Sequence, residues 1–122
     1  MDDEAYTYIV IDDRAPMREQ IKGILGELGC ECVGEAADGE SGADLYFEEY
    51  PDFVLLDIEM PGIDSLKALK MILEVDPEAF VVMLSAMGGE SKLIEAMKLG
   101  AADYLIKPLS MPIVREKFLK WV

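Results

Sequence analysis

The chain has 122 residues, a length that suits one compact domain spanning residues 1–122 and leaves little room for a second. It is 52% hydrophobic and 30% charged, which allows a buried core and excludes a disordered chain. Its 11 basic and 25 acidic residues give a net charge of -14, so we expect no direct binding to nucleic acid or to an anionic membrane surface.

The sequence also indicates where the protein resides. No stretch approaches the ~20 apolar residues that a membrane-spanning helix needs, and no signal-peptide pattern opens the chain. Cys30 and Cys32 are the only cysteines, and we expect both thiols to stay free. Two lone thiols without a disulfide framework are typical of a reducing compartment, so we expect a cytoplasmic location.

Short apolar runs alternate along the chain with amphipathic stretches. Residues 6–11 form an apolar, β-branched run that predicts a strand, and this run stops at Asp12 and Asp13. Pro16 then stands where a helix favours its first proline, and apolar residues at helical spacing over residues 17–28 predict a helix that Gly29 closes. The first unit is therefore a strand followed by a helix.

The rest of the chain repeats this alternation, with polar or helix-breaking residues between the elements. The predicted elements are a weak strand at 32–36, a helix at 38–50, a strand at 53–56 before Asp57, a helix capped by Asp64, a strand at 80–84 before Ser85, a helix closed by Gly100, a strand at 103–106 before Lys107 and a helix at 111–121.

Five strand–helix units in strict alternation predict a parallel sheet with helices on both faces. The unbroken apolar runs belong in the centre of the sheet, because a central strand is buried on both sides. Residues 32–36, shorter and more polar, belong at an edge. In open sheets of this kind, the ligand site lies beyond the carboxyl ends of the strands.

Polar side chains stand at those strand ends. Asp12 and Asp13 follow the first strand, Asp57 the third, Ser85 the fourth and Lys107 the fifth. Three carboxylates at one rim repel one another unless a cation shares the space, and their hard oxygens suit Mg²⁺. We predict that Asp57, on a central strand, is a nucleophile for a phosphoryl group, and that Asp12 and Asp13 hold the metal.

Each of these residues also has a purely structural interpretation. Taken alone, Asp12 and Asp13 fit the role of helix-capping residues equally well. Asp57 alone could be a polar residue of a loop, and Tyr104 a half-buried packing residue. The occurrence of Ser85 and Lys107 at neighbouring strand ends favours a functional site.

Four segments of the chain resemble the receiver domain of bacterial two-component response regulators: IVIDDRAPMR, DFVLLDIEMPGID, VVMLSA and GAADYLIKP. The resemblance covers essentially the whole chain, in order and with ordinary spacing. It implies a flavodoxin-like, doubly wound (βα)5 fold with a five-stranded parallel sheet in the order 2-1-3-4-5.

The resemblance also implies the roles of individual residues. Asp57 would be the phosphoacceptor in a Mg²⁺-dependent reaction, with Asp12 and Asp13 in the acidic pocket. Glu59 would provide its backbone carbonyl to the metal. One departure from the family pattern is Ser65, where a glycine is common, and we expect it to alter the start of the third helix slightly.

Three further positions match residues that transmit the signal in this family. Ser85 would form a hydrogen bond with a phosphoryl oxygen, and Lys107 would form an ion pair with the phosphoryl group. The peptide bond between Lys107 and Pro108 would be cis. Tyr104 would be an aromatic switch that turns inward after phosphorylation.

The resemblance implies a histidine kinase as phosphodonor and a downstream protein that binds the face of the fourth helix, fifth strand and fifth helix. The chain has no histidine, so it cannot be its own phosphohistidine donor. We expect that the protein is not an enzyme: it would catalyse only the transfer of the phosphoryl group to itself and its own dephosphorylation.

Three functions remain open at this stage. The favoured one is a stand-alone CheY-like module, for example in chemotaxis, because the chain stops after the last predicted helix. The second is the receiver part of a multidomain regulator, such as a DNA-binding transcription factor. The third is a magnesium phosphatase with an aspartyl nucleophile. Such enzymes have a second acidic residue two positions after the nucleophile, which acts as general acid and base, and Glu59 stands at that position after Asp57.

Overall fold

The computed structural model describes residues 5–60 and 65–122 of the chain. Five strands and five helices alternate along these residues, and every predicted element is present. In chain order they are β1 (Thr7–Ile11), α1 (Ala15–Glu27), β2 (Glu31–Ala36), α2 (Gly39–Glu49), β3 (Phe53–Asp57), α3 (Ser65–Val75), β4 (Val81–Ser85), α4 (Glu90–Leu99), β5 (Asp103–Ile106) and α5 (Met111–Trp121). The cap predicted at Asp64 lies outside the described residues.

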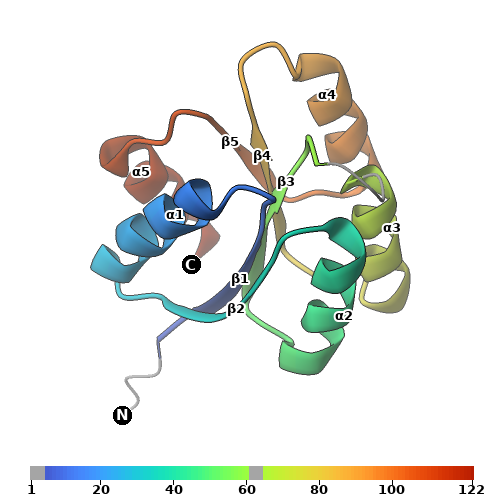
Figure 1. The fold of residues 1–122 in the computed structure, drawn as a ribbon, viewed down its shortest axis with the longest axis horizontal. Helices are drawn as coiled ribbons and strands as arrows, with labels where there is room; N and C mark the ends of the chain where they lie inside the picture. Colours follow the sequence, from blue (N-terminus) through green and yellow to red (C-terminus); the bar gives the residue numbers. More distant parts are fainter. Residues whose placement is uncertain (1–4, 61–64) are drawn as a thin grey trace.

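The strands form a parallel sheet in the order β2-β1-β3-β4-β5, which confirms the predicted flavodoxin-like order. Neighbouring strands end at nearly the same level, because Asp57 pairs with Leu84 and Ser85 pairs with Ile106. The carboxyl ends of the strands therefore lie along one edge of the sheet. The loops that lead to α1 and α4 leave from this edge (Figure 1).

Burial distinguishes the central strands from the edge strand, as predicted. Every residue of β3 and β4 is buried. In β2, Glu31 and Glu35 are exposed and only Ala36 is buried. Because full burial of a large aliphatic side chain stabilises a fold by about 1.5–3 kcal/mol, the apolar central strands are most stable with helices on both faces.

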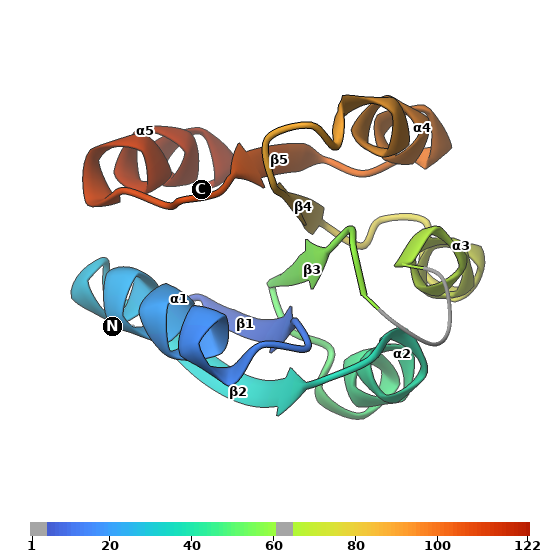
Figure 2. The ribbon, with the colours of Figure 1, turned by 45° about the horizontal axis from the view of Figure 1, so that its top comes forward.

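The helices cover the two faces unequally. α2, α3 and α4 lie on one face of the sheet, and α1 and α5 lie on the other (Figure 2). The alternation of side chains along β3 divides the core accordingly. Val54 and Leu56 join the cluster beneath α2, α3 and α4, and Phe53 and Leu55 join the cluster beneath α1 and α5.

The ends of the helices settle one of the alternatives left open by the sequence. The N-cap residue of α1 is Arg14, so neither Asp12 nor Asp13 caps that helix, and the capping interpretation is wrong.

At the carboxyl ends of two helices, Gly29 and Gly100 follow α1 and α4 with φ angles of 88° and 124°. Such positive φ angles favour glycine, which explains why both helices stop there.

Two expectations from the composition also have structural counterparts. Cys30 and Cys32 are free thiols, as predicted. Burial raises the pKa of the Cys30 thiol to about 11, so this thiol is protonated at neutral pH. No helix within residues 5–60 and 65–122 is both long and apolar enough to cross a membrane.

Candidate functional site

Three carboxylates converge at the carboxyl edge of the sheet. Asp12 and Asp13 follow β1, and Asp57 is the last residue of β3. Each contributes one oxygen to a group of atoms that all lie within 4.8 Å of one another. Asp12 and Asp57 are 0% and 2% exposed, whereas Asp13 is exposed, so the cluster opens to solvent on the side of Asp13.

Asp12 is held by four interactions. Its backbone N–H donates to the carbonyl of Ala36 at 3.0 Å, which continues the pairing of β1 with β2. Its Oδ1 accepts from the backbone N–H of Arg14 at 2.9 Å, and its Oδ2 accepts from Lys107 Nζ at 3.1 Å. Its own carbonyl accepts from Arg18 Nη1 at 2.6 Å. The position of this buried carboxylate is therefore fixed by neighbours on several elements.

Among the described residues, the Asp57 carboxylate also has two contacts, but both go to the same oxygen. Its Oδ1 accepts from the backbone N–H of Glu59 at 3.2 Å and lies 3.3 Å from Lys107 Nζ. Burial raises the pKa of the Asp57 carboxyl, and the nearby Asp12 carboxylate adds to the increase. The Glu59 N–H and the Lys107 ammonium act in the opposite direction. A cation bound here would relieve the remaining cost of burying this charge.

Lys107 bridges the two buried carboxylates. Its ammonium is 3.1 Å from Asp12 Oδ2 and 3.3 Å from Asp57 Oδ1. Its backbone N–H donates to the carbonyl of Ser85 at 2.8 Å, and the Lys107–Pro108 peptide bond is cis, as predicted. Three carboxylates and one ammonium together have a net charge of -2. A divalent cation that prefers oxygen ligands would neutralise this charge.

Ser85 lies at the end of β4, beside the last residue of β3 in the sheet. It is buried, and its hydroxyl donates to the carbonyl of Ala86 at 3.0 Å. Within residues 5–60 and 65–122, no hydrogen bond joins Ser85 to Asp57. A Cβ atom on Gly89 would come within 2.6 Å of Ser85 Oγ, so the backbone before α4 approaches this hydroxyl closely.

Tyr104 lies away from the acidic cluster, on β5. The residue is 37% exposed. Lys117 Nζ is 3.6 Å from the centroid of the Tyr104 ring and also donates to the Tyr104 carbonyl at 2.6 Å. Lys117 pairs with Asp103 Oδ1 at 3.2 Å, and Trp121 Nε1 donates to Asp103 Oδ2 at 2.7 Å. This network joins β5 to α5.

Two residues near the cluster did not stand out in the sequence as contributors to it. Ser65, the first residue of α3, is buried, and its hydroxyl donates to the carbonyl of Asp57 at 2.6 Å. Arg18 reaches the carbonyl of Asp12 from α1. Both contacts go to backbone oxygens, so no pattern of residue types in the sequence could have indicated them.

The fold and the site together define a class of protein. It is a doubly wound α/β domain with buried carboxylates, a bridging lysine and a cis-proline at the carboxyl edge of its sheet. The family model described as the response regulator receiver domain matches residues 8–118. The chain belongs to this family, which serves in two-component systems.

Individual relatives agree with this assignment. The chain is 41% identical over 116 residues to chemotaxis protein CheY of Bacillus subtilis, covering 95% of this chain and 97% of that protein. A chain in the crystal structure of the CheX-CheY-BeF3-Mg2+ complex from Borrelia burgdorferi matches with a TM-score of 0.88 at 32% identity, covering 94% of this chain and 87% of that one.

A third comparison concerns a longer protein. NtrX from Brucella abortus, in complex with ADP, matches with a TM-score of 0.84 at 32% identity. The match covers 96% of this chain but only 27% of the NtrX chain. Relatives of this chain therefore include both proteins of similar length and a protein in which the matching part is about a quarter of the whole.

Proposed function

We propose that this receiver domain accepts a phosphoryl group on Asp57 in a Mg²⁺-dependent reaction and thereby switches its binding to a partner protein. One observation carries the proposal. The buried Asp57 carboxylate lies 3.3 Å from Lys107 Nζ, and its ligand oxygen lies within 4.8 Å of those of Asp12 and Asp13. A buried carboxylate that could act as the nucleophile, an ammonium group and two further carboxylates that could bind a metal thus lie at one rim.

The proposed transfer is a direct displacement at phosphorus. An Asp57 carboxylate oxygen forms a bond to phosphorus while the bond from phosphorus to a histidine nitrogen of the donor kinase breaks, and the released imidazole takes up a proton from solvent. Lys107 is already beside Asp57 and offsets the charge that arrives with the phosphoryl group. Hydrolysis later returns inorganic phosphate and the free carboxylate.

The donor set fits Mg²⁺. Asp12, Asp13 and Asp57 are the proposed side-chain ligands, and the backbone carbonyl of Glu59 is the proposed fourth protein ligand. Mg²⁺ prefers hard oxygen ligands and commonly takes carboxylates together with substrate phosphate oxygens. When bound, it would neutralise charge on the phosphoryl oxygens. The exposed position of Asp13 leaves the site open for a phosphodonor to approach.

We propose that Ser85 and Tyr104 transmit the modification. Ser85 is buried at the end of β4, next to Asp57, and would turn its hydroxyl from Ala86 to the new phosphoryl oxygen. Tyr104 would then turn inward from its exposed position. Phosphorylation can shift this equilibrium only by binding one arrangement better than the other.

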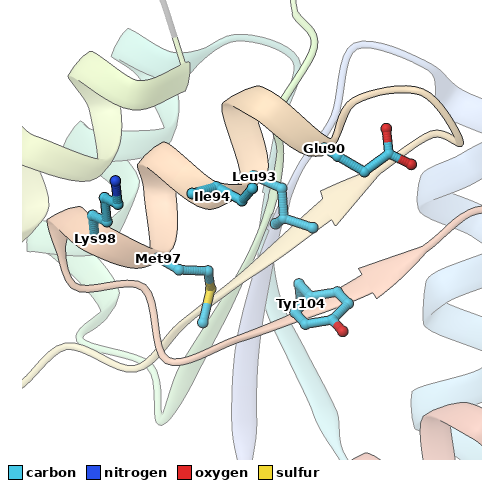
Figure 3. Close-up of a pocket in the computed structure, with 6 residues that line it drawn as sticks. All are labelled: Glu90, Leu93, Ile94, Met97, Lys98 and Tyr104. Atoms are coloured by element: carbon cyan, nitrogen blue, oxygen red, sulfur yellow. The ribbon is translucent and has the colours of Figure 1, made fainter.

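The downstream partner would bind the face formed by α4, β5 and α5. An apolar groove of about 440 Å³ lies between α4 and β5 on this face. Figure 3 shows Leu93 and Met97 extending from α4 toward the side of Tyr104. The lining residues are Glu90, Leu93, Ile94, Met97, Lys98 and Tyr104. Because Tyr104 forms one wall, its rotation would change the shape of the groove.

Two output arrangements fit this function. A stand-alone regulator similar to the CheY proteins, acting in chemotaxis, is supported by a relative that matches over 97% of its length. A receiver within a longer regulator is supported by NtrX, of which the match covers 27%.

In either arrangement, we propose that the domain modifies itself and does not turn over a separate substrate. Steady hydrolysis of small phosphomonoesters would instead favour the phosphatase alternative.

The acceptor role can be tested by intact-mass spectrometry. Incubation with acetyl phosphate and Mg²⁺ should add ~80 Da, the mass of one phosphoryl group. The gain should disappear in D57N and when EDTA removes the metal. D44N, which removes the same charge from an exposed position on α2, should label like the wild type. Labelling of D57N at the wild-type level would refute the proposal.

A further inference from the structure

Arg18 connects the acidic cluster to the edge strand of the sheet. Its Nη1 donates to the backbone carbonyl of Asp12 at 2.6 Å, and its Nε donates to Glu35 Oε1 at 2.9 Å. The arginine comes from α1 and the glutamate from β2, so the guanidinium spans two elements that flank the end of β1. The Arg18 side chain is only 19% exposed, which limits competition from water.

The carbonyl that Arg18 binds belongs to the planar peptide unit between Asp12 and Asp13. Fixing this carbonyl therefore fixes the orientation of the Asp13 backbone N–H and restricts the direction in which the Asp13 side chain leaves the chain. Within residues 5–60 and 65–122, no hydrogen bond or ion pair reaches the Asp13 carboxylate itself. The Asp13 carboxylate is thus oriented through its backbone.

We propose that Arg18 is a positioning residue for the Mg²⁺ site: it holds the Asp12–Asp13 peptide so that the Asp13 carboxylate faces the Asp57 carboxylate. This inference rests on the proposed function, because it assumes that the acidic cluster binds Mg²⁺. The planar guanidinium suits the task, since its fork of donors reaches two acceptors at fixed angles. Glu35 anchors one side of the fork and the Asp12 carbonyl takes the other.

The charge of Arg18 makes the proposal sharply testable. A cation beside an acidic cluster opposes the binding of a second cation, so loss of the charge alone would tighten Mg²⁺ binding. Loss of a positioning contact would weaken it. Lys22 provides the matched control, because it also pairs with Glu35, at 2.6 Å, from one turn further along α1. Within the described residues, Lys22 makes no contact with Asp12.

The experiment is isothermal titration of Mg²⁺ into the wild type, R18A, R18K and K22A, at a temperature where thermal unfolding shows all four to be folded. We expect R18A to bind Mg²⁺ ~10-fold more weakly, the lower end of the effect of removing a group that orients a metal ligand. K22A should bind as the wild type or slightly more tightly. R18K keeps the charge but has a single donor atom, so its affinity should fall between those of R18A and the wild type.

Labelling with acetyl phosphate gives a second readout. In R18A, the Mg²⁺ concentration for half-maximal labelling should rise by the same factor as the dissociation constant, while the rate at saturating Mg²⁺ stays close to that of the wild type. R18A that binds Mg²⁺ as tightly as the wild type, or more tightly, overturns the role of Arg18 and leaves the proposed function intact. A wild-type protein that binds no Mg²⁺ overturns both.

Discussion

Asp57, the proposed phosphoacceptor, is a residue whose buried charge opposes stability. Its carboxylate is buried beside that of Asp12, and its pKa is raised by burial and by that neighbour. A cation bound at the proposed site would offset the resulting repulsion. Such sites commonly carry a stability cost that substitution relieves.

We therefore expect D57N to be more stable than the wild type in the absence of Mg²⁺, by on the order of 1 kcal/mol, a typical size for a single substitution. Asparagine keeps the shape of the side chain and can still accept from the Glu59 N–H, but it removes the repulsion from Asp12. Urea unfolding at pH 7 with EDTA measures the difference. D44N should match the wild type, and a D57N protein less stable than the wild type would contradict this account of the pocket.

Asp103 shows the opposite balance. Burial alone would raise the pKa of its carboxyl, but hydrogen bonds from Trp121, from the Tyr104 N–H and from Lys117 outweigh that effect and lower the pKa. The folded-state pKa is therefore below the unfolded-state value of about 3.9. A carboxylate of this kind contributes stability that is complete above the unfolded-state pKa and is lost as the pH falls through the folded-state pKa.

The D103N variant should consequently be less stable than the wild type at pH 7. The difference in urea midpoint between the two proteins should stay constant from pH 7 to about 5 and shrink as the pH falls below about 4, because the unfolded chain takes up a proton at Asp103 before the folded protein does. Urea unfolding at several pH values measures it. A difference that stays constant down to pH 3 would show that the hydrogen bonds to Asp103 do not lower the pKa of its carboxyl.

At the scale of the elements, the two glycines Gly23 and Gly42 have opposite roles in their helices. Gly42 lies in α2, and a Cβ atom there would come within 2.5 Å of Ile11 Cδ1, in the core. Gly23 lies in α1, is exposed, and a Cβ atom there would meet nothing within 4 Å. Gly42 therefore allows α2 to pack closely on β1, whereas Gly23 only weakens α1.

Alanine substitutions separate these roles. G42A should lower the free energy of unfolding by about 1–3 kcal/mol, the usual cost of overpacking a core. G23A should raise it by about 0.5–1 kcal/mol, because alanine favours the helical backbone more than glycine does. Chemical unfolding of both variants tests the pair. Equal effects of the same sign would mean that packing on Ile11 does not limit α2.

The elements were predictable because each strand is an apolar run that stops at a polar residue. The errors are confined to boundaries. β3 and β4 include the terminal Asp57 and Ser85, which the apolar pattern excludes, because ladder pairing continues into both residues. α1 begins at Ala15, so Pro16 lies in its first turn, as predicted.

The side-chain contacts of the site were less predictable than its composition. The gathering of Asp12, Asp57 and Lys107 follows from parallel topology, because each lies at or directly after the carboxyl end of a strand. The bonds from Ser65 and Arg18 to backbone carbonyls depend on how α3 and α1 pack, and the contact between Lys117 and Tyr104 depends on the docking of α5. Such contacts come from tertiary packing and leave no local pattern in the sequence.

At the scale of the whole molecule, the net charge of -14 and the acidic cluster together predict a response to divalent cations. A ligand that binds only the folded state stabilises it by about 2.7 kcal/mol when present at 100 times its dissociation constant. Mg²⁺ should therefore raise the Tm of the wild type, and D13N should show a much smaller rise. NaCl at matched ionic strength controls for screening of the net charge. Equal rises with NaCl and with Mg²⁺ would argue against a specific site.

We propose that, of the three carboxylates gathered at one rim, Asp57 alone takes the phosphoryl group. Borohydride reduces an acyl phosphate to an alcohol, so it marks the modified aspartate permanently as homoserine. After treatment with acetyl phosphate and Mg²⁺, reduction and peptide mass mapping should find homoserine at position 57 and unmodified aspartate at 12 and 13. Homoserine at position 12 or 13, or at none of the three, would contradict the account.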